Sequence, residues 1–220
     1  MTVAKVRSGV FLGFAAVAGL CVSVPLAAQK SPEKIRLTER SKDGAVLIRV
    51  PAQPFSFALQ FSKNGNSGFL SRVYLMNVKP SAAPGYTWIA RTLSPGRYRL
   101  DSMWQQGQWS VCLEKGTFEF EVKGGKIEYL GTLNAEAILL SLQDQAAGAG
   151  KTVQSGTGYF LSHGETRVPP ISDRDEAGVA AARSFADQTM NGSGGLIELA
   201  QVNEAAFATS GAGKAIKTCG

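Results

Sequence analysis

The sequence predicts a mainly β protein: an antiparallel β-sandwich of about eight strands with a helix-containing C-terminal extension. Apolar and polar residues alternate along several short runs, and Gly, Pro, Asn and Ser separate these runs. Thirteen of the 19 aromatic residues lie between Phe55 and Tyr129, which places the core in this part of the chain. Alternation with a period of two is typical of strands that have one buried and one solvated face. Many short strands at this spacing favour a sandwich.

The strands follow one another from Ala45 onward. After a β-branched run that starts there, they are expected at residues 55–61, 69–78, 86–93, 97–101, 109–113, 117–123 and 126–133. The clearest alternation is Phe118, Phe120 and Val122 on one face against Glu119, Glu121 and Lys123 on the other. Gly124-Gly125 then predicts a hairpin turn, because both glycines can take a positive φ at little cost.

The composition changes after Gln143. Residues 144–171, which contain 145-QAAGAG-150 and 155-SGTG-158, are expected to form a Gly-rich linker or loop. A helix should follow, with Ser172 as its N-cap and acidic residues in its first turn. Its buried stripe is expected at Ala177, Ala180, Ala181, Phe185 and Gln188, and Asn191-Gly192 should end it. Such a narrow stripe suits a helix close to a sheet. Residues 196–202 could add a strand, so residues 172–220 form a helix, a short strand and a tail.

The N-terminus predicts export. Lys5 and Arg7 precede an apolar stretch that ends near Pro25, and Ala27-Ala28 then precede polar residues. This order is typical of a secretory signal peptide, residues 1–28, that is cleaved after Ala28. An uncleaved membrane anchor is the alternative, because the apolar run approaches the length of a span. Lipidation of Cys21 is disfavoured by the bulky residue that precedes it. A polar lead-in, residues 29–43, and the sandwich domain, residues 44–143, would follow.

Composition and charge exclude several classes of protein. The 220 residues are 44% hydrophobic, so the chain has enough apolar surface to fold. The formal charge of +6 becomes +4 in the cleaved chain, with 21 basic and 17 acidic residues. These charges are interleaved rather than gathered on one face, which argues against nucleic-acid binding. One His and three Cys argue against a disulfide-dense scaffold and against a His-based metal site.

Several segments resemble a known family. They are 94-SPGRYRL-100, Trp109, Cys112, 118-FEFEV-122 and 125-GKIEYLG-131. The chain thereby resembles exported bacterial envelope proteins of unknown function, whose β-sandwich carries a Pro-Gly-x-Tyr/His strand and a later Gly-Lys-x-x-Tyr-x-Gly strand. More distantly it is similar to transthyretin-like and carboxypeptidase-regulatory-like sandwiches. The resemblance covers residues 45–140 and rests on structural motifs, so it implies a sandwich and an envelope location but no reaction.

Two short motifs imitate catalytic or cofactor sites. The segment 148-GAGKT-152 resembles the end of a phosphate-binding loop, but Gln145 occupies the position of the first required glycine. Ser162-His163 lacks the Gly-x-Ser-x-Gly turn of a nucleophile elbow. We therefore expect no cofactor and no catalytic residue from these motifs.

Three features remain as candidates for function. Cys112 and Cys219 are the two cysteines that would remain after cleavage, and in an oxidising compartment they could pair and close a loop of about 100 residues. Arg91, Arg97 and Arg99 accompany Trp104 and Trp109, and could form a binding surface for a glycan, a lipid head group or an envelope protein. The alternative is that these tryptophans fill the core edge and the arginines are solvated.

The third feature is the pair Glu119 and Glu121 on one strand face. Two carboxylates could serve a glycoside hydrolase if they flanked a cleft, whereas the alternation also explains them as the solvated side of a strand. The sequence therefore favours a non-enzymatic binding or structural module of the envelope, with an envelope glycan hydrolase as the alternative. The ligand, the partner and the oligomeric state are not indicated.

Overall fold

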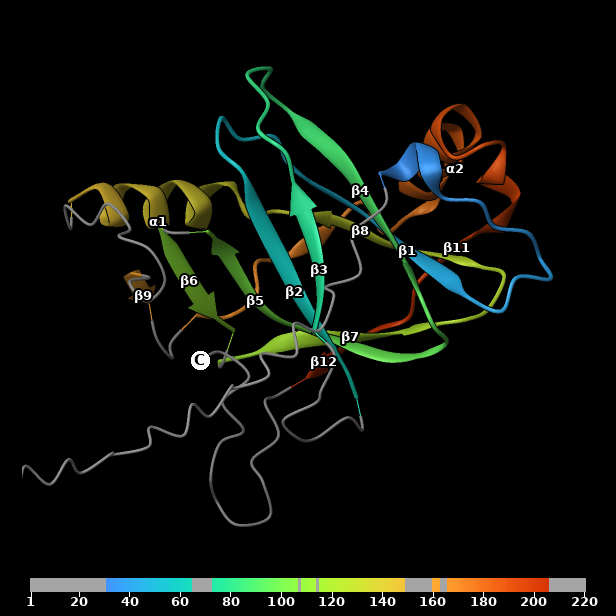
Figure 1. The fold of residues 1–220 in the computed structure, drawn as a ribbon, viewed down its shortest axis with the longest axis horizontal. Helices are drawn as coiled ribbons and strands as arrows, with labels where there is room; N and C mark the ends of the chain where they lie inside the picture. Colours follow the sequence, from blue (N-terminus) through green and yellow to red (C-terminus); the bar gives the residue numbers. More distant parts are fainter. Residues whose placement is uncertain are drawn as a thin grey trace, which may run out of the picture.

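The computed structural model describes residues 31–64, 73–106, 108–113, 115–148, 160–162 and 166–205. The expected signal peptide, His163, Cys219 and all of the loop-like 148-GAGKT-152 motif except its first glycine lie outside these residues. The described chain is mainly β, with two sheets and two α-helices, as the sequence predicts. Figure 1 shows the sheets facing each other, with one helix at an end and one on an outer face.

The first sheet contains five strands in which β1 and β8 form the centre. Its members are β1 (Gly44–Pro51), β4 (Tyr86–Leu93), β8 (Ile127–Leu133), β10 (Ile171–Ser172) and β11 (Ile197–Leu199). β4 is one edge and pairs antiparallel with β1, which pairs parallel with β8. β10 and β11 share the other side of β8. The two parallel pairings within this sheet depart from the expected antiparallel arrangement, while the sandwich itself is confirmed.

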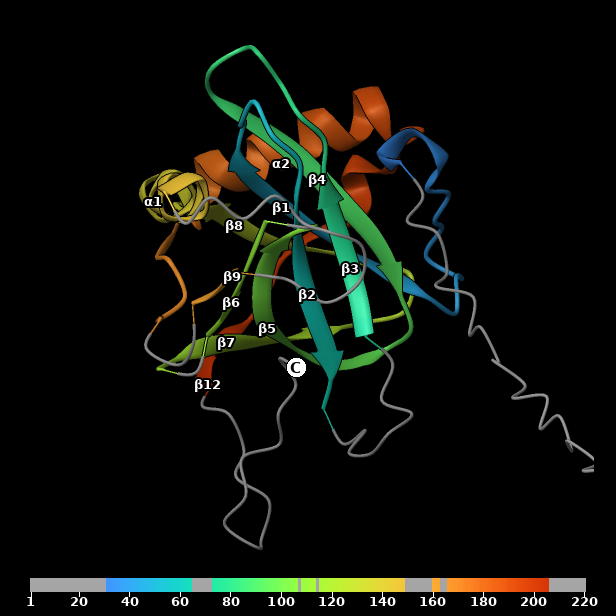
Figure 2. The same cartoon turned by 60° about the vertical axis from the view of Figure 1, so that its left-hand side comes forward.

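The second sheet contains seven strands arranged around the long strand β5. Its members are β2 (Phe57–Lys63), β3 (Val73–Val78), β5 (Gly96–Gln105), β6 (Trp109–Cys112), β7 (Thr117–Val122), β9 (Phe160–Ser162) and β12 (Val202–Ala205). β5 pairs with β2 along one side, and with β7 and then β6 along the other. The edge strands β3 and β4 of the two sheets lie side by side (Figure 2).

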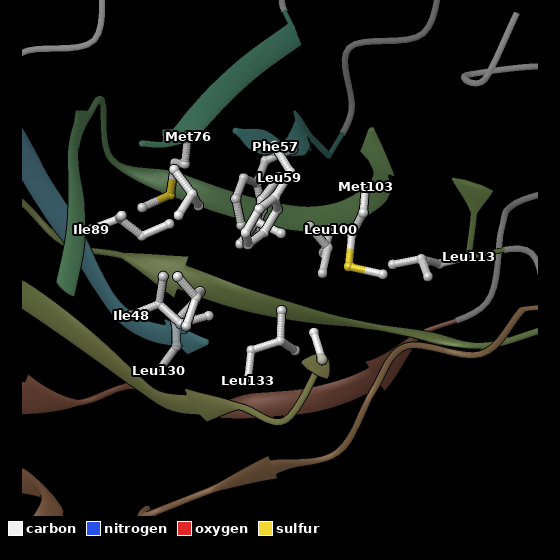
Figure 3. Packing of buried hydrophobic residues seen from close by; sticks show 14 of the residues in the cluster. Ile48, Phe57, Leu59, Met76, Ile89, Leu100, Met103, Leu113, Leu130 and Leu133 are labelled. Carbon is white, nitrogen blue, oxygen red and sulfur yellow. The ribbon is translucent and has the colours of Figure 1, made fainter. Parts of the chain in front are cut away.

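The main core lies between the two sheets. Ile48, Ile89 and Leu130 of the first sheet face Leu59 and Leu100 of the second (Figure 3), and all five are buried. Helix α1 (Glu136–Gly148) closes one end of this core with Leu139, Leu142 and Ala146. This helix was not expected from the sequence pattern. The loop expected from residue 144 does not begin there, because α1 continues to Gly148.

Helix α2 (Glu176–Thr189) covers the outer face of the first sheet, so the fold has three layers (Figure 1). Ala182 and Ala186 pack there with Leu47 and Tyr129 in a second core. The helix close to a sheet is thus confirmed, but four of the five positions in its expected stripe were wrong, while Phe185 is half-buried and packs against the second core. The buried positions are Gly178, Ala182 and Ala186, spaced four residues apart, while Ala177, Ala180, Ala181 and Gln188 are exposed. The N-cap is Asp175, which accepts a hydrogen bond from the Gly178 N–H, and Ser172 lies in β10.

Gly124-Gly125 does not form a hairpin. The strands that it connects belong to different sheets, so this turn carries the chain from the second sheet to the first. Gly125 has φ of 69°, and a Cβ there would lie 2.3 Å from the carbonyl oxygen of Glu39. The glycine is required by a close approach of the lead-in segment, which sequence spacing does not reveal.

The C-terminal strands tie the extension to both sheets. The expected strand at residues 196–202 is two strands, because the chain leaves β11 in the first sheet and enters β12 in the second. Arg174 fastens this crossing by donating hydrogen bonds to the carbonyl oxygens of Leu130 at 2.7 Å and Ala200 at 2.5 Å. The segment 171–205 is therefore part of the sandwich.

Candidate functional site

Arg97, Arg99, Glu119 and Glu121 lie on one outer face, that of β5 and β7. Arg97 is the register partner of Glu121, and Arg99 is the partner of Glu119. Opposite charges across neighbouring strands attract each other and stabilise the pair. The surface predicted from the arginines and the carboxylate pair predicted for a hydrolase are thus two halves of one mixed-charge ladder.

Both sides of this ladder have partners besides each other. Glu119 accepts a hydrogen bond from Asn64 at 2.6 Å, and its carboxylate lies 4.0 Å from the Arg97 guanidinium. Arg99 donates to the buried carboxylate of Asp101 at 2.8 Å, and burial raises the pKa of that carboxyl. The ladder therefore presents neither a cationic patch nor an isolated carboxylate pair.

The other three residues of the predicted surface differ from these in their surroundings. Trp109 is fully buried and its indole N–H donates to Gln143 of α1 at 3.4 Å, so it belongs to the core. Arg91 of β4 donates to the Leu75 carbonyl of β3 and lies over the Tyr74 ring, where it bridges the two sheets. Trp104 is partly buried on β5. The five residues do not gather on one face, because Trp109 lies in the core between the sheets and Arg91 belongs to the first sheet.

Cys112 lies on β6 and is 3% exposed. Cys219 lies outside the described residues, so its pairing with Cys112 stays a prediction.

A hollow of about 800 Å³ lies along β4, and we call it the β4 hollow. It is lined by residues 31–34, by Asn77 and Lys79, by residues 86–89, and by Phe185 and Thr189 of α2. Residues 32–34 form the 3₁₀ turn η1 (Pro32–Lys34), the blue turn beside α2 in Figure 1. Ile35, which is 1% exposed, fixes this turn by packing into the second core.

The inner wall of the β4 hollow is an ordered aromatic stack. The rings of Trp88 and Phe185 are stacked, with centroids 5.1 Å apart and an angle of 14°. The Arg49 guanidinium lies 4.9 Å from the Tyr86 ring centroid and 5.7 Å from that of Trp88. Tyr86 itself is 49% exposed, so about half of its surface stays open to solvent.

Polar residues hold Arg49 in this position. Its guanidinium donates to Asp173 at 2.7 Å, and the Thr132 hydroxyl donates to the same carboxylate oxygen at 2.5 Å. Asp173 has φ of 54°, and Gly178 leaves room for its backbone, since a Cβ at Gly178 would lie 1.9 Å from the Asp173 carbonyl oxygen. The ion pair with Asp173 therefore holds the Arg49 guanidinium against the Tyr86 ring.

The rim of the β4 hollow is charged. Lys34, Lys79 and Glu33 are all exposed. The carboxylate of Glu33 is attracted by the charges of both lysines. The pKa of Glu33 is lowered, first by a hydrogen bond from Ser31 and more weakly by the charges of Lys79 and Lys34. Two lysines against one glutamate leave the rim with an excess of positive charge.

A second hollow, of about 810 Å³, lies beside β7 and β12 and includes Lys115, Arg167 and Arg174. It adjoins in sequence residues 163–165 and 206–220, which lie outside the described residues. Since Arg174 is committed to backbone carbonyls, we assign this hollow no function.

Among the residues that line the β4 hollow, only Phe185 is named by the sequence patterns, as a buried position of the expected helix. Two signals were present: Arg49 interrupts the apolar run 45–51, and Tyr86 and Trp88 are spaced to share a strand face. Their contacts with Phe185 and η1 are tertiary, because Phe185 is about 100 residues after Tyr86 in the sequence and η1 is about 50 residues before it.

Neither a metal centre nor a membrane-spanning helix is found in the described part of the chain. Nowhere in it do three or more His, Cys, Asp or Glu side chains come together as ligands. No helix there has the length and apolar content that crossing a bilayer requires. Comparisons with protein-family models, with curated proteins and with solved structures find no match for this chain.

Proposed function

We propose that this protein is an exported, non-enzymatic binding module of the bacterial envelope. The observation that carries the proposal is the β4 hollow, a concave site of ligand size with a preorganised aromatic wall and a charged rim. The signal-like N-terminus and the resemblance to envelope sandwiches support the location. A purely structural role in the envelope is less favoured, because it gives no reason for an exposed tyrosine supported by the half-buried ion pair of Arg49 and Asp173.

The hydrolase alternative has less support. Glycoside hydrolysis requires two carboxyl groups that flank a cleft. Neither hollow described above is lined by Glu119 or Glu121, and both side chains face arginines across the strand pair.

The cysteines fit an oxidising compartment. A disulfide at Cys112, on the buried strand β6, would be typical of an exported domain rather than of a cytosolic one. Within this proposal its partner is Cys219, which would fasten the C-terminal tail to the sandwich.

The test uses the full-length chain with a C-terminal tag, expressed in a bacterium with and without residues 1–28. We expect the full chain to be cleaved and recovered with the envelope fraction, and the truncated chain to stay in the cytoplasm. Purified protein should then sediment with washed envelopes without releasing soluble sugar from them. Cytoplasmic retention of the full chain, failure to sediment, or sugar release lost in Glu119→Gln would overturn the proposal.

A further inference from the structure

We propose that the β4 hollow binds an acidic saccharide, with the sugar ring against Tyr86 and the acidic group at Lys34 and Lys79. This inference rests on the proposed function and specifies the ligand class of that binding site. The acidic group is a carboxylate or a phosphate, since both are recognised by the same lysine chemistry.

The size and composition of the hollow suit a sugar. A volume of about 800 Å³ lies within the range of about 300–1,000 Å³ that holds small ligands. Sugars combine an apolar face of C–H groups with a rim of hydroxyls. The hollow offers the same combination, because aromatic rings line it next to the hydroxyl side chains of Ser31, Thr87 and Thr189.

Tyr86 is prepared to act as a platform before any ligand arrives. Arg49 covers one side of its ring and is itself fixed by Asp173, so little side-chain entropy remains to be lost on binding. Half of the Tyr86 surface stays exposed. An ordered and exposed aromatic ring is the usual anchor of a binding site.

The rim selects for negative charge. Lys34 and Lys79 come from different segments, η1 and the residue after β3, and both line the same hollow. Their long side chains are exposed, so they can reach a ligand over Tyr86 without first leaving a buried partner. A neutral saccharide would leave this excess charge unused, whereas an acidic one would pair with it.

Two other ligand classes fit less well. A lipid surface would contact a continuous apolar patch, but the exposed large hydrophobic residues among those described lie on four different elements: Val73, Tyr86, Leu140 and Leu199. A peptide added as a strand to the β4 edge would need an open edge, and η1 and β3 both contact β4. The bounded hollow therefore favours a compact ligand.

The experiment measures binding by calorimetry and by the fluorescence of the tryptophans, with the intact mature protein. The probes are oligosaccharides that carry uronate or sugar phosphate, their neutral counterparts, a glutamate-rich peptide, and anionic lipid vesicles. Tyr86→Ala should weaken binding of the acidic saccharide about tenfold or more, because the anchor ring is lost. Lys34→Ala/Lys79→Ala should remove the preference for acidic over neutral probes and the dependence on salt.

Matched controls separate these effects from general ones. Leu140→Ala removes a side chain of similar exposure on α1. Arg40→Ala/Lys42→Ala removes two exposed cations from the lead-in segment. The backbone of this segment lies against Gly124 and Gly125, at the end of β1 that is far from the β4 hollow. Both controls should bind as the wild type does, and circular dichroism should show that all variants are folded.

The outcomes are distinct. Binding of the uronate or the phosphate probes that is lost in Tyr86→Ala supports the proposal, and the stronger of the two identifies the acidic group. Equal binding of neutral probes, binding only of the peptide or vesicles, or no saccharide binding overturns it. If Tyr86→Ala still sediments with envelopes while the wild type binds no saccharide, the ligand assignment fails and the envelope module stands.

Discussion

Replacing Ala182 by Leu should destabilise the protein, whereas the same change at Ala181 should not. Ala182 is 0% exposed and belongs to the second core with Leu47 and Tyr129, while Ala181 is exposed on the solvent side of α2. Extra methylene groups in a filled core cost about 1–3 kcal/mol, and surface changes stay within about 0.5 kcal/mol. The difference in helix propensity between Ala and Leu is small and is the same at both positions.

Urea unfolding followed by circular dichroism measures both variants. With an m-value of about 2 kcal/mol/M, Ala182→Leu should lower the unfolding midpoint by about 0.5–1.5 M relative to Ala181→Leu. Near-ultraviolet circular dichroism adds an independent readout, because Trp88 stacks on Phe185 of the same helix. A larger loss of stability in Ala181→Leu than in Ala182→Leu would refute the position of α2, and would restore the stripe expected from sequence.

Three further predictions concern a cap, a buried acid and the disulfide. Asp175→Ala should cost about 1 kcal/mol in unfolding free energy through loss of the α2 N-cap, and Asp175→Asn should retain most of it; equal losses would contradict the capping role. Burial raises the pKa of Glu128 above its ordinary 4.5, more than Lys123 lowers it, so the folded state holds this proton more tightly and stability falls as the pH rises above about 4.5. The unfolding free energy of Glu128→Gln, measured by urea titration, should therefore rise relative to that of the wild type as the pH increases from 4 to 7. If the difference between the two proteins stays the same over this pH range, Glu128 is not a buried acid with a raised pKa. If Cys112 and Cys219 pair, the exported protein should have a mass lower by two hydrogen atoms without reductant than with it. Cys112→Ser should then lose about 4 kcal/mol of unfolding free energy, because the bond closes a loop of about 100 residues. Two thiols that react with an alkylating reagent would exclude this pair.

Local patterns predicted the strands well. The expected strand at residues 86–93 coincides with β4, and Phe118, Phe120 and Val122 of β7 are buried as their alternation indicates. A strand leaves a period-two pattern wherever one face is solvated, so this pattern can be detected from sequence alone. Helix α1 was missed because its last turn consists of Ala and Gly, a composition that is also typical of loops.

The sites were harder to predict than the strands. Arg97 and Arg99 were correctly assigned to one face, but their cross-strand partners Glu119 and Glu121 were treated as a separate feature. The register of α2 was wrong by one position, because a helix rich in alanine offers several stripes of equal hydrophobicity. Only the surface against which a helix packs selects one of them.

The sequence by itself determined the class of the fold, the order of most strands and the features typical of export. These properties are local: they depend on the alternation of neighbouring residues and on the composition of short segments. The tertiary structure alone decided which sheet each strand joins, that Gly124-Gly125 crosses between sheets, and that Arg49, Tyr86 and Phe185 meet around one hollow. Such contacts join residues tens to more than a hundred positions apart, and their formation depends on how the layers pack against each other rather than on any local pattern.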